Sequence, residues 1–353
     1  MKIRKTFPLL LLVVLISTGY FVPIINAGPY RDYDAFMTAF LSLAKDYPEL
    51  VTYEAVGETV ENRDIIMFKI GNPAGGRVLF DGAMHGEESI GGELLYFYAE
   101  WLLTSDDPLA NSILARAYTL LIPALNVDEY NNARKNANGV DLNRNFATNW
   151  ESGVSDPDSE NYRGPAPLSE PESQTTINVF QTYSPHFYVN LHMWAGPYYA
   201  GSHYGDRTYY SLLVDKIDSL SRERGVTPYP YYGEFGGAGM AISDAARAGV
   251  TSFLIELTER IVSLSEIETV ILPTFIPIAT VLTQECALFP HFQPWDLKQD
   301  GKVSVTDVVI VALAFGSTPE STKWNPLADL NADRIIDVLD LKVVSMHFGE
   351  EYT

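Results

Sequence analysis

An imidazole and a carboxylate three residues apart are the first side chains in this sequence that could bind a metal. His85 and Glu88 belong to the run Asp-Gly-Ala-Met-His-Gly-Glu-Glu, which follows the apolar residues Val78, Leu79 and Phe80. At this spacing both side chains would lie on one face of a helical turn and could hold one cation together. Such pairs also arise by chance, so a metal site needs a third ligand and a base elsewhere.

Two later strands end in residues that could fill these roles. His192 closes the segment His-Phe-Tyr-Val-Asn-Leu-His and, like His85, follows an apolar strand. It is therefore the natural third ligand, although most histidines at strand ends are structural. Glu256 is the one carboxylate in the apolar run Thr-Ser-Phe-Leu-Ile-Glu-Leu. Because burial of an unpaired carboxylate is costly or raises its pKa, a general base is a more attractive role for Glu256 than a structural one.

Residues 126–146 carry many polar side chains directly after a predicted buried strand. Arg134, Asp141, Asn143 and Arg144 lie in this segment. In α/β proteins, binding sites lie beyond the carboxyl ends of strands. Arginines interleaved with asparagines suit recognition of a carboxylate and an oxyanion. A solvated surface loop is the alternative.

The elements that must position these side chains alternate between helices and strands. Helical spacing of apolar residues predicts helices over residues 30–50 and 91–103. This alternation predicts an α/β sheet. Strands are predicted over residues 52–70 (two short strands around Glu61), 118–125, 186–192 and 251–257.

Composition and charge limit the possible functions. With 353 residues and 46% hydrophobic content, the chain can bury a large core. The formal net charge of -21 argues against a nucleic-acid partner, because no basic stripe could release counterions from phosphates. Residues 1–27 predict a secretory signal, with an uncleaved membrane anchor as the alternative. Cys286 is the single cysteine, so the chain can form no internal disulfide.

Over residues 30–289 the chain resembles the zinc metallocarboxypeptidases of the carboxypeptidase A type. Five separated motifs occur in the order of that family: His-x-x-Glu, Arg-Lys, Asp-x-Asn-Arg-Asn, the strand-terminal histidine, and Glu-Leu after a buried strand. The resemblance implies a mixed central β-sheet flanked by helices. It also implies a monomeric catalytic unit that cuts peptides or proteins.

The resemblance implies a role for each matching residue. His85, Glu88 and His192 would hold Zn²⁺, and Asp141 would orient His85. Glu256 would act as the general base toward a zinc-activated water.

The same resemblance implies the groups that bind the substrate. Arg134 would stabilise the oxyanion together with zinc. Asn143 and Arg144 would hold the terminal carboxylate, which makes the enzyme an exopeptidase. Tyr232 matches the mobile tyrosine of the family, with Tyr231 close enough to compete.

The segment around this tyrosine bears on substrate preference. Residues 229–239 are rich in tyrosine and glycine, as expected of a mobile lid or, equally, of a packed Ω-loop. Counting from Tyr232 puts Gly239 at the position that often sets pocket preference, with Met240 beside it. Because neither residue is charged, we expect a preference for apolar or aromatic C-terminal side chains.

Two other functions stay open. A relative that cuts peptidoglycan stem peptides, or an amidohydrolase that deacylates amino acids, would use the same residues. The second alternative is not an enzyme but a non-catalytic zinc-binding protein of the cell surface. Retention of Glu256 argues against it, because a pure binder needs no base. A serine hydrolase is disfavoured, because the sequence has no Gly-x-Ser-x-Gly motif.

The C-terminal residues form a second module with an internal repeat. Residues 295–316 and 328–349 match at an offset of 33 positions. Each copy carries oxygen ligands at the spacing of a calcium loop, followed by an amphipathic helix. The pair resembles a dockerin domain, a small all-α unit that binds Ca²⁺. The expected ligands are Asp296, Asp300, Ser304 and Asp307 in the first loop, and Asp329, Asn331, Asp333, Asp337 and Asp340 in the second.

Departures from the loop pattern set the expected occupancy. In the first loop, Lys298 replaces an oxygen ligand. In the second loop, Arg334 replaces the turn glycine, but the oxygen ligands are kept, so Ca²⁺ is expected mainly there. An acidic helical pair without calcium is the alternative. Dockerins bind cohesin modules, which implies attachment to a scaffold or a cell surface. The usual partner-contact positions hold Val305, Thr306, Val338 and Leu339. The predicted organisation is a signal at 1–27, a catalytic domain at 28–292 and the dockerin-like module at 293–353.

Overall fold

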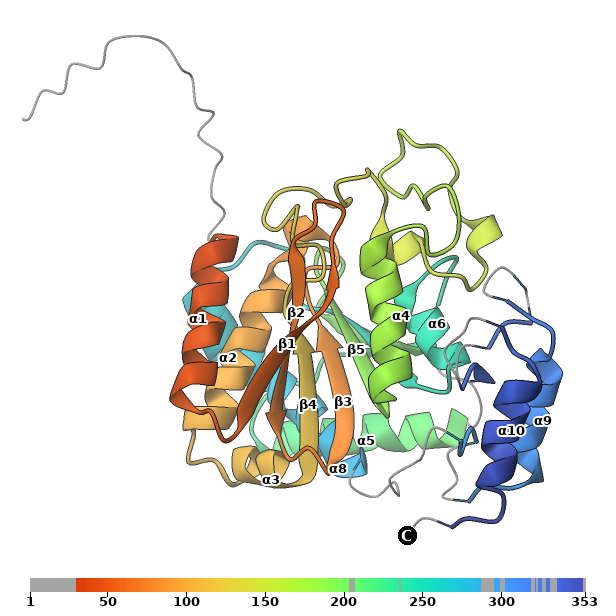
Figure 1. The fold of residues 1–353 in the computed structure, drawn as a ribbon. Coiled ribbons are helices and arrows are strands. Elements are labelled where there is room, and N and C mark those ends of the chain that lie inside the picture. Colours follow the sequence, from red (N-terminus) through yellow and green to blue (C-terminus); the bar gives the residue numbers. More distant parts are fainter. Residues whose placement is uncertain are drawn as a thin grey trace, which may run out of the picture.

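The computed structural model of the protein contains a large α/β unit followed by a small helical unit (Figure 1). It describes residues 30–202, 207–234, 236–286, 295–298, 302–318, 321, 323–325, 328–330 and 335–351. The predicted signal at residues 1–27 lies outside these ranges.

One mixed β-sheet forms the centre of the large unit, with strand order β1-β2-β4-β3-β5-β8-β6-β7. The central strands β4, β3, β5 and β8 run parallel, and β1 and β2 extend the sheet antiparallel on one side. On the other side, β6 pairs antiparallel with β8 and parallel with β7. The predicted mixed sheet is therefore confirmed. The strands are β1 Val51–Glu58, β2 Asp64–Gly71, β3 Gly76–Asp81, β4 Ala117–Ile122, β5 Phe187–His192, β6 Tyr198–Ser202, β7 Tyr231–Glu234 and β8 Thr251–Glu256.

Helices flank the sheet on both faces (Figure 1). The group α1, α2, α3 and α8 packs together on one face, and α4 packs against α6 on the other. The α-helices are α1 Tyr33–Asp46, α2 Ile90–Thr104, α3 Pro108–Arg116, α4 Pro171–Tyr183, α5 Arg207–Glu223, α6 Ala241–Arg247, α7 Leu264–Glu266, α8 Leu272–Cys286, α9 Val305–Ala314 and α10 Val338–Met346. Shorter helical turns are η1 Gly86–Glu88, η2 Leu142–Arg144, η3 Trp150–Ser152 and η4 Ile267–Ile271.

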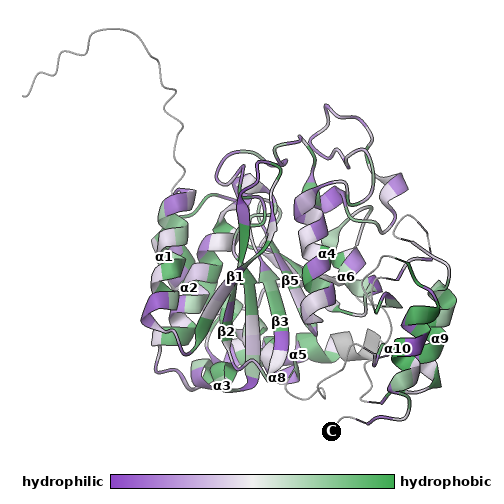
Figure 2. Ribbon diagram, viewed as in Figure 1, coloured by the Kyte–Doolittle hydropathy of each residue, from purple (hydrophilic) through white to green (hydrophobic). Residues whose placement is uncertain are grey.

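The central strands are largely apolar because helices cover both faces of the sheet. Every residue of β5 is buried, because helices lie on both faces of the central strands. Figure 2 shows the central strands as largely apolar and polar residues on the outer surface of α4. Strand β5 is therefore largely apolar, and its buried polar residues Asn190 and His192 need hydrogen-bond partners.

The helical segment Leu264–Cys286, which comprises α7, η4 and α8, is long and apolar enough to cross a membrane by length and composition. Most of its apolar window is buried inside the protein. Phe275 in this segment packs against Phe80 of β3 and Tyr98 of α2. Its position is thus that of a core helix. Cys286 at its end is buried.

The C-terminal unit has its own small apolar core, to which α9 and α10 contribute Val311 and Val344. Its two repeats make equivalent backbone hydrogen bonds. Val303 exchanges them with residues 349–350 (2.8 and 2.9 Å), and Ile336 exchanges them with residues 316–317 (2.8 and 3.0 Å). Because Val303 and Ile336 are 33 positions apart, each copy pairs with the end of the other in the same way.

An ion pair ties the start of the described chain to α2. The Arg31 guanidinium donates to Glu93 Oε2 (2.8 Å), and the Arg31 backbone N–H donates to Glu93 Oε1 (2.9 Å). The Glu93 side chain is fully buried. Burial raises the pKa of Glu93, and the two donors of Arg31 oppose this rise.

We expect Arg31→Met to lower the free energy of unfolding by about 3 kcal/mol, because Glu93 would stay buried without its charge partner. Denaturant unfolding measures this change. The control is Arg222→Met, which breaks an exposed pair with Asp218 and should cost less than about 0.5 kcal/mol. Equal losses in the two variants would contradict this account of Glu93.

Candidate active site

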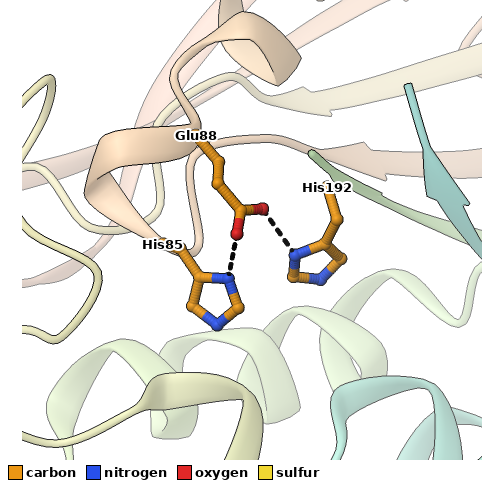
Figure 3. A group of neighbouring side chains, drawn as sticks. All are labelled: His85, Glu88 and His192. Atoms are coloured by element: carbon orange, nitrogen blue, oxygen red, sulfur yellow. Dashed lines mark hydrogen bonds and ion pairs between the residues drawn. The ribbon is translucent and has the colours of Figure 1, made fainter. Parts of the chain in front are cut away.

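Three buried side chains meet beyond the ends of β3 and β5 (Figure 3). His85 immediately precedes η1, Glu88 closes η1, and His192 is the last residue of β5. Glu88 Oε1 lies 2.8 Å from His85 Nδ1, and Glu88 Oε2 lies 2.9 Å from His192 Nδ1. One ligand atom from each residue lies within 4.8 Å of those of the other two. The structure thus brings together the three ligands predicted from the sequence.

Strand register and one glycine bring the trio together. Parallel β3 and β5 pair with Asp81 opposite Asn190, so their carboxyl ends lie side by side. The loop after β3 then passes very close to residues 129–133. A Cβ at Gly86 would lie 2.1 Å from Glu129 O, so only glycine fits between the two ligands of this loop.

Each imidazole presents Nδ1 to Glu88 and Nε2 to a second polar side chain. His85 Nε2 lies 3.0 Å from Asp141 Oδ1. His192 Nε2 contacts Asn190 Oδ1 and lies 3.2 Å from Asn143 Nδ2. Two imidazoles and one carboxylate are a ligand set typical of catalytic zinc, and oriented outer partners are typical of metal-binding histidines. The residues present therefore fit a zinc ion.

The electrostatics of the trio favour a cation at its centre. Burial opposes ionisation of Glu88 and Asp141, yet the neighbouring His85 holds the pKa of both carboxyls well below the usual range. Burial works to lower the pKa of His85, but these two carboxylates raise it to about 9. A proton on His85 therefore balances the carboxylates, and a metal that binds Nδ1 must displace this proton.

Arg134 lies against the ligand cluster. Its Nε and Nη2 atoms donate to Asp141 Oδ2 (3.2 and 2.8 Å). Its Nη1 lies 3.1 Å from His85 Nδ1 and 3.4 Å from Glu88 Oε1. The guanidinium predicted to stabilise an oxyanion therefore reaches the ligand atoms themselves.

The turn η2 holds the predicted carboxylate-binding residues next to His192. Asn143 N donates to Asp141 Oδ1 (2.9 Å), and Asn143 Oδ1 accepts from Ala241 N (3.0 Å). The Arg144 guanidinium donates to the carbonyl of Asn143 (2.8 Å). Among the residues that the structure describes, this is its one hydrogen bond, which leaves the other guanidinium donors for a ligand.

Glu256 lies beside the trio at the end of β8, in register with His192 of β5. The following loop wraps around it: Ala195 N lies 3.4 Å from Glu256 Oε2, and a Cβ at Gly196 would lie 2.1 Å from Glu256 O. Burial raises the pKa of the Glu256 carboxyl, Glu88 adds to this rise, and His192 opposes it. A raised pKa suits a general base that works near neutral pH.

The aromatic segment at residues 229–239 differs from both sequence expectations. Residues 231–234 form the edge strand β7 and pair with β6, so this part is neither a free lid nor an Ω-loop. The Tyr232 side chain is 73% exposed and lies against Tyr198, which pairs with Glu256 across the sheet. Tyr231 instead packs on the buried Tyr199. Exposure therefore favours Tyr232 over Tyr231 as the tyrosine that can reach a ligand.

Comparison with known proteins agrees with this geometry. A family model described as zinc carboxypeptidase matches residues 37–235, which is more than half of the chain. The chain belongs to the zinc carboxypeptidase family. Zinc is the metal expected for this family, and the His-Glu-His trio is a group that could hold it.

Individual relatives align with only part of this chain. Mast cell carboxypeptidase A of Rattus norvegicus is 28% identical over 192 residues, 47% of this chain and 46% of the relative. Carboxypeptidase B of Astacus astacus is 28% identical over 225 residues, 56% of this chain and 74% of the relative. The chain therefore spans about half the length of the mast cell carboxypeptidases that it matches.

The fold also matches a solved structure. The crystal structure of the carboxypeptidase A from Helicoverpa armigera superposes with a TM-score of 0.64 and 21% sequence identity, over 73% of this chain and 74% of that one. At this identity the likeness establishes a shared fold.

Three site residues received no role from the sequence: Asp81, Tyr188 and Asn190. Asp81 opens the run that contains His85, and Tyr188 and Asn190 stand four and two positions before His192. Because side chains alternate along a strand, residues 188, 190 and 192 share one face. This period of two was the signal that could have linked Asn190 to the ligand.

Gly239 packs against the turn η2, which holds the predicted carboxylate-binding residues. Its backbone has a φ of +66°, and a Cβ there would lie 1.9 Å from Arg144 O. Phe146 N donates to Gly239 O (2.9 Å), and Gly239 N donates to Thr148 O (2.8 Å). This packing requires glycine whatever the substrate, so the effect of Gly239 on pocket preference stays a prediction.

We expect Gly239→Ala to lower the free energy of unfolding by about 1 kcal/mol for the left-handed backbone and by about 1–3 kcal/mol more for the clash with Arg144. The matched control is Gly225→Ala, where φ is +71° and a Cβ would have no neighbour within 4 Å. Denaturant unfolding compares the two. An equal loss in both variants would show that the Arg144 contact is unimportant.

Proposed function

We propose that the protein is a zinc-dependent carboxypeptidase that removes the C-terminal residue of peptides or proteins. The contact between Asn143 Nδ2 and His192 Nε2, at 3.2 Å, carries this proposal. It puts a turn with free guanidinium donors next to a metal-ligand trio. A substrate carboxylate bound by that turn would leave the preceding peptide bond near the metal.

The trio of His85, Glu88 and His192 would hold the zinc. Zinc bound there would supply Lewis-acid chemistry to the scissile carbonyl and the attacking water. Asp141 accepts from His85 at Nε2 and keeps Nδ1 directed at the centre. Asp141 also holds the guanidinium of Arg134, so one buried carboxylate positions both a ligand and the proposed oxyanion donor.

Glu256 would take a proton from the attacking water and pass it to the departing amine. It lies beyond residues 37–235, the part that the family model matches. Support for its role comes from its register with His192 and from the burial that raises its pKa. Arg134 would donate to the carbonyl oxygen as charge develops there. The Tyr232 side chain, exposed at the edge of the sheet, would rotate onto the bound peptide while β7 stays paired with β6.

Asn143 and Arg144 would bind the terminal carboxylate, Arg144 through two parallel N–H donors. A requirement for that carboxylate would make the enzyme an exopeptidase. We propose a preference for apolar or aromatic C-terminal residues, because Gly239 and Met240 carry no charge. One catalytic unit would be sufficient, because every proposed group comes from one chain.

Replacing Glu256 tests this function. We expect Glu256→Gln to lower kcat for blocked dipeptides by about 10²- to 10⁴-fold, because the base is lost, and to retain bound zinc. The control is Glu259→Gln, which removes a nearby exposed carboxylate and should leave the rate unchanged. If the zinc-loaded wild type cuts no peptide with a free carboxylate, the exopeptidase proposal fails. Peptidoglycan stem peptides and acylated amino acids then become the substrates to test.

For the C-terminal unit we propose a dockerin-like module that binds Ca²⁺ and docks onto a cohesin-type protein of a scaffold or cell surface. The equivalent helix starts support it. Ser304 with Asp307, and Asp337 with Asp340, form the same capping box at α9 and α10. The buried carboxylate of Asp307 also accepts from Lys298 N (2.8 Å), so it already holds its loop in a turn.

Of the other predicted calcium ligands, two are described by the structure and three are not. Asp296 and Asp329, at the first position of each loop, are buried, as expected of ligands that face a bound ion. Asp300, Asn331 and Asp333 lie outside the described residues. The proposed partner contacts are supported by exposure, because Val305 and Val338 are 65% and 63% exposed and Leu339 is 48% exposed.

Restoring the missing ligand tests the calcium proposal. We expect Lys298→Asp to raise the Ca²⁺ affinity of the first loop, because a carboxylate would replace a cation at a ligand position. Lys298→Ala removes the cation without adding a ligand, so it should give a smaller gain. Calorimetric titration of the full chain with Ca²⁺ distinguishes them. Failure of Ca²⁺ to bind either variant or the wild type would contradict a calcium module.

Export of the protein is also a proposal. It rests on the basic start, the apolar centre and the small residue at Ala27 within residues 1–27. A protein on a scaffold or cell surface would need such a signal. Because the single cysteine allows no internal disulfide, the stability of an exported protein would depend on core packing and bound ions.

A further inference from the structure

A buried chain of hydrogen bonds runs from the centre of the sheet to His192. Asp81 ends β3, and Tyr188 and Asn190 precede His192 on the same face of β5. The Tyr188 hydroxyl donates to Asp81 Oδ2 (2.7 Å), and Asn190 Nδ2 donates to Asp81 Oδ1 (2.7 Å). All four side chains are buried. Both oxygens of Asp81 are thus used as acceptors inside the protein.

Asp81 decides which end of the Asn190 amide faces His192. Because Nδ2 is held by Asp81, Oδ1 faces the other way and contacts His192 Nε2. An amide oxygen can only accept a hydrogen bond. Asn190 therefore favours the His192 tautomer that carries its proton on Nε2. In that tautomer the Nδ1 lone pair is free, and Nδ1 is the atom that faces Glu88.

Asn143 opposes this preference at the same nitrogen. Its Oδ1 accepts from Ala241 N (3.0 Å), which leaves Nδ2 facing His192 Nε2 at 3.2 Å. An amide nitrogen can only donate, so Asn143 favours a proton on Nδ1 instead. His192 cannot satisfy both asparagines at once. When it donates to Asn190, the Asn143 amide is left available to another acceptor.

We propose that Asp81 and Asn190 are positioning residues that keep His192 in its metal-binding tautomer and thereby free the Asn143 amide for the substrate carboxylate. Asp141 does this directly for His85, and Asp81 does it for His192 through Asn190. The inference rests on the proposed zinc and carboxylate sites. It links metal binding to substrate binding through one imidazole.

Two variants separate this role from general packing. Asn190→Leu and Tyr188→Phe each remove one donor to Asp81, but only Asn190→Leu removes the acceptor for His192. We expect Asn190→Leu to weaken zinc binding by about 10- to 100-fold and Tyr188→Phe to leave it close to wild type. Competition of the full-length protein with a chromophoric chelator measures the zinc affinity, and circular dichroism confirms the fold. Equal zinc affinity in Asn190→Leu and wild type, or equal loss in both variants, would overturn the inference.

A third variant keeps the test decisive if Asn190→Leu does not fold. Asn143→Ala removes the opposing donor, so zinc should bind several-fold more tightly than in the wild type. Unchanged or weaker zinc binding in Asn143→Ala would overturn the inference. Failure of the wild type itself to bind zinc would instead contradict the proposed function.

Discussion

The register between β3 and β5 is the constraint on which the site depends. This register sets Asp81 opposite Asn190. His85, four residues after Asp81, and His192, two residues after Asn190, therefore meet at the carboxylate of Glu88. Because side chains alternate along a strand, a slip of one residue would turn Asn190 and His192 to the other face. Asp81 couples the two strands, since its hydrogen bonds to Tyr188 and Asn190 cross from β3 to β5.

Charge balance is the second condition. The trio region buries the carboxylates of Glu88 and Asp141, and each one has cationic or imidazole partners. Without these partners, two buried carboxylates would be very costly. Arg134 supplies positive charge in the described structure, the two carboxylates raise the pKa of His85, and a divalent cation would add positive charge at the same place. The same charges that stabilise the fold here therefore prepare the site for metal.

Much of this site was predictable because its residues stand at the ends of strands. Each of these strands can be recognised from a short apolar run in the sequence. His85, His192 and Glu256 could each be placed without knowledge of strand order. Asn190 could not, because its role depends on Asp81, 109 positions away, and on a register that no local pattern encodes. The edge strand β7 was missed because its short Tyr-Gly sequence gives no alternation. In the C-terminal unit, the repeat predicted the helices, and the exchange of backbone hydrogen bonds between its copies emerged only from the structure.

Anomalous diffraction at the zinc edge, from crystals of the zinc-loaded protein, would show which atoms bind the metal. We expect one peak bonded to Nδ1 of His85, Nδ1 of His192 and the Glu88 carboxylate at about 2.0–2.2 Å. We also expect each Nε2 to keep its hydrogen bond, His85 to Asp141 and His192 to Asn190. Zinc bound through an Nε2 atom, zinc at another position, or no zinc at all would contradict the proposed metal site.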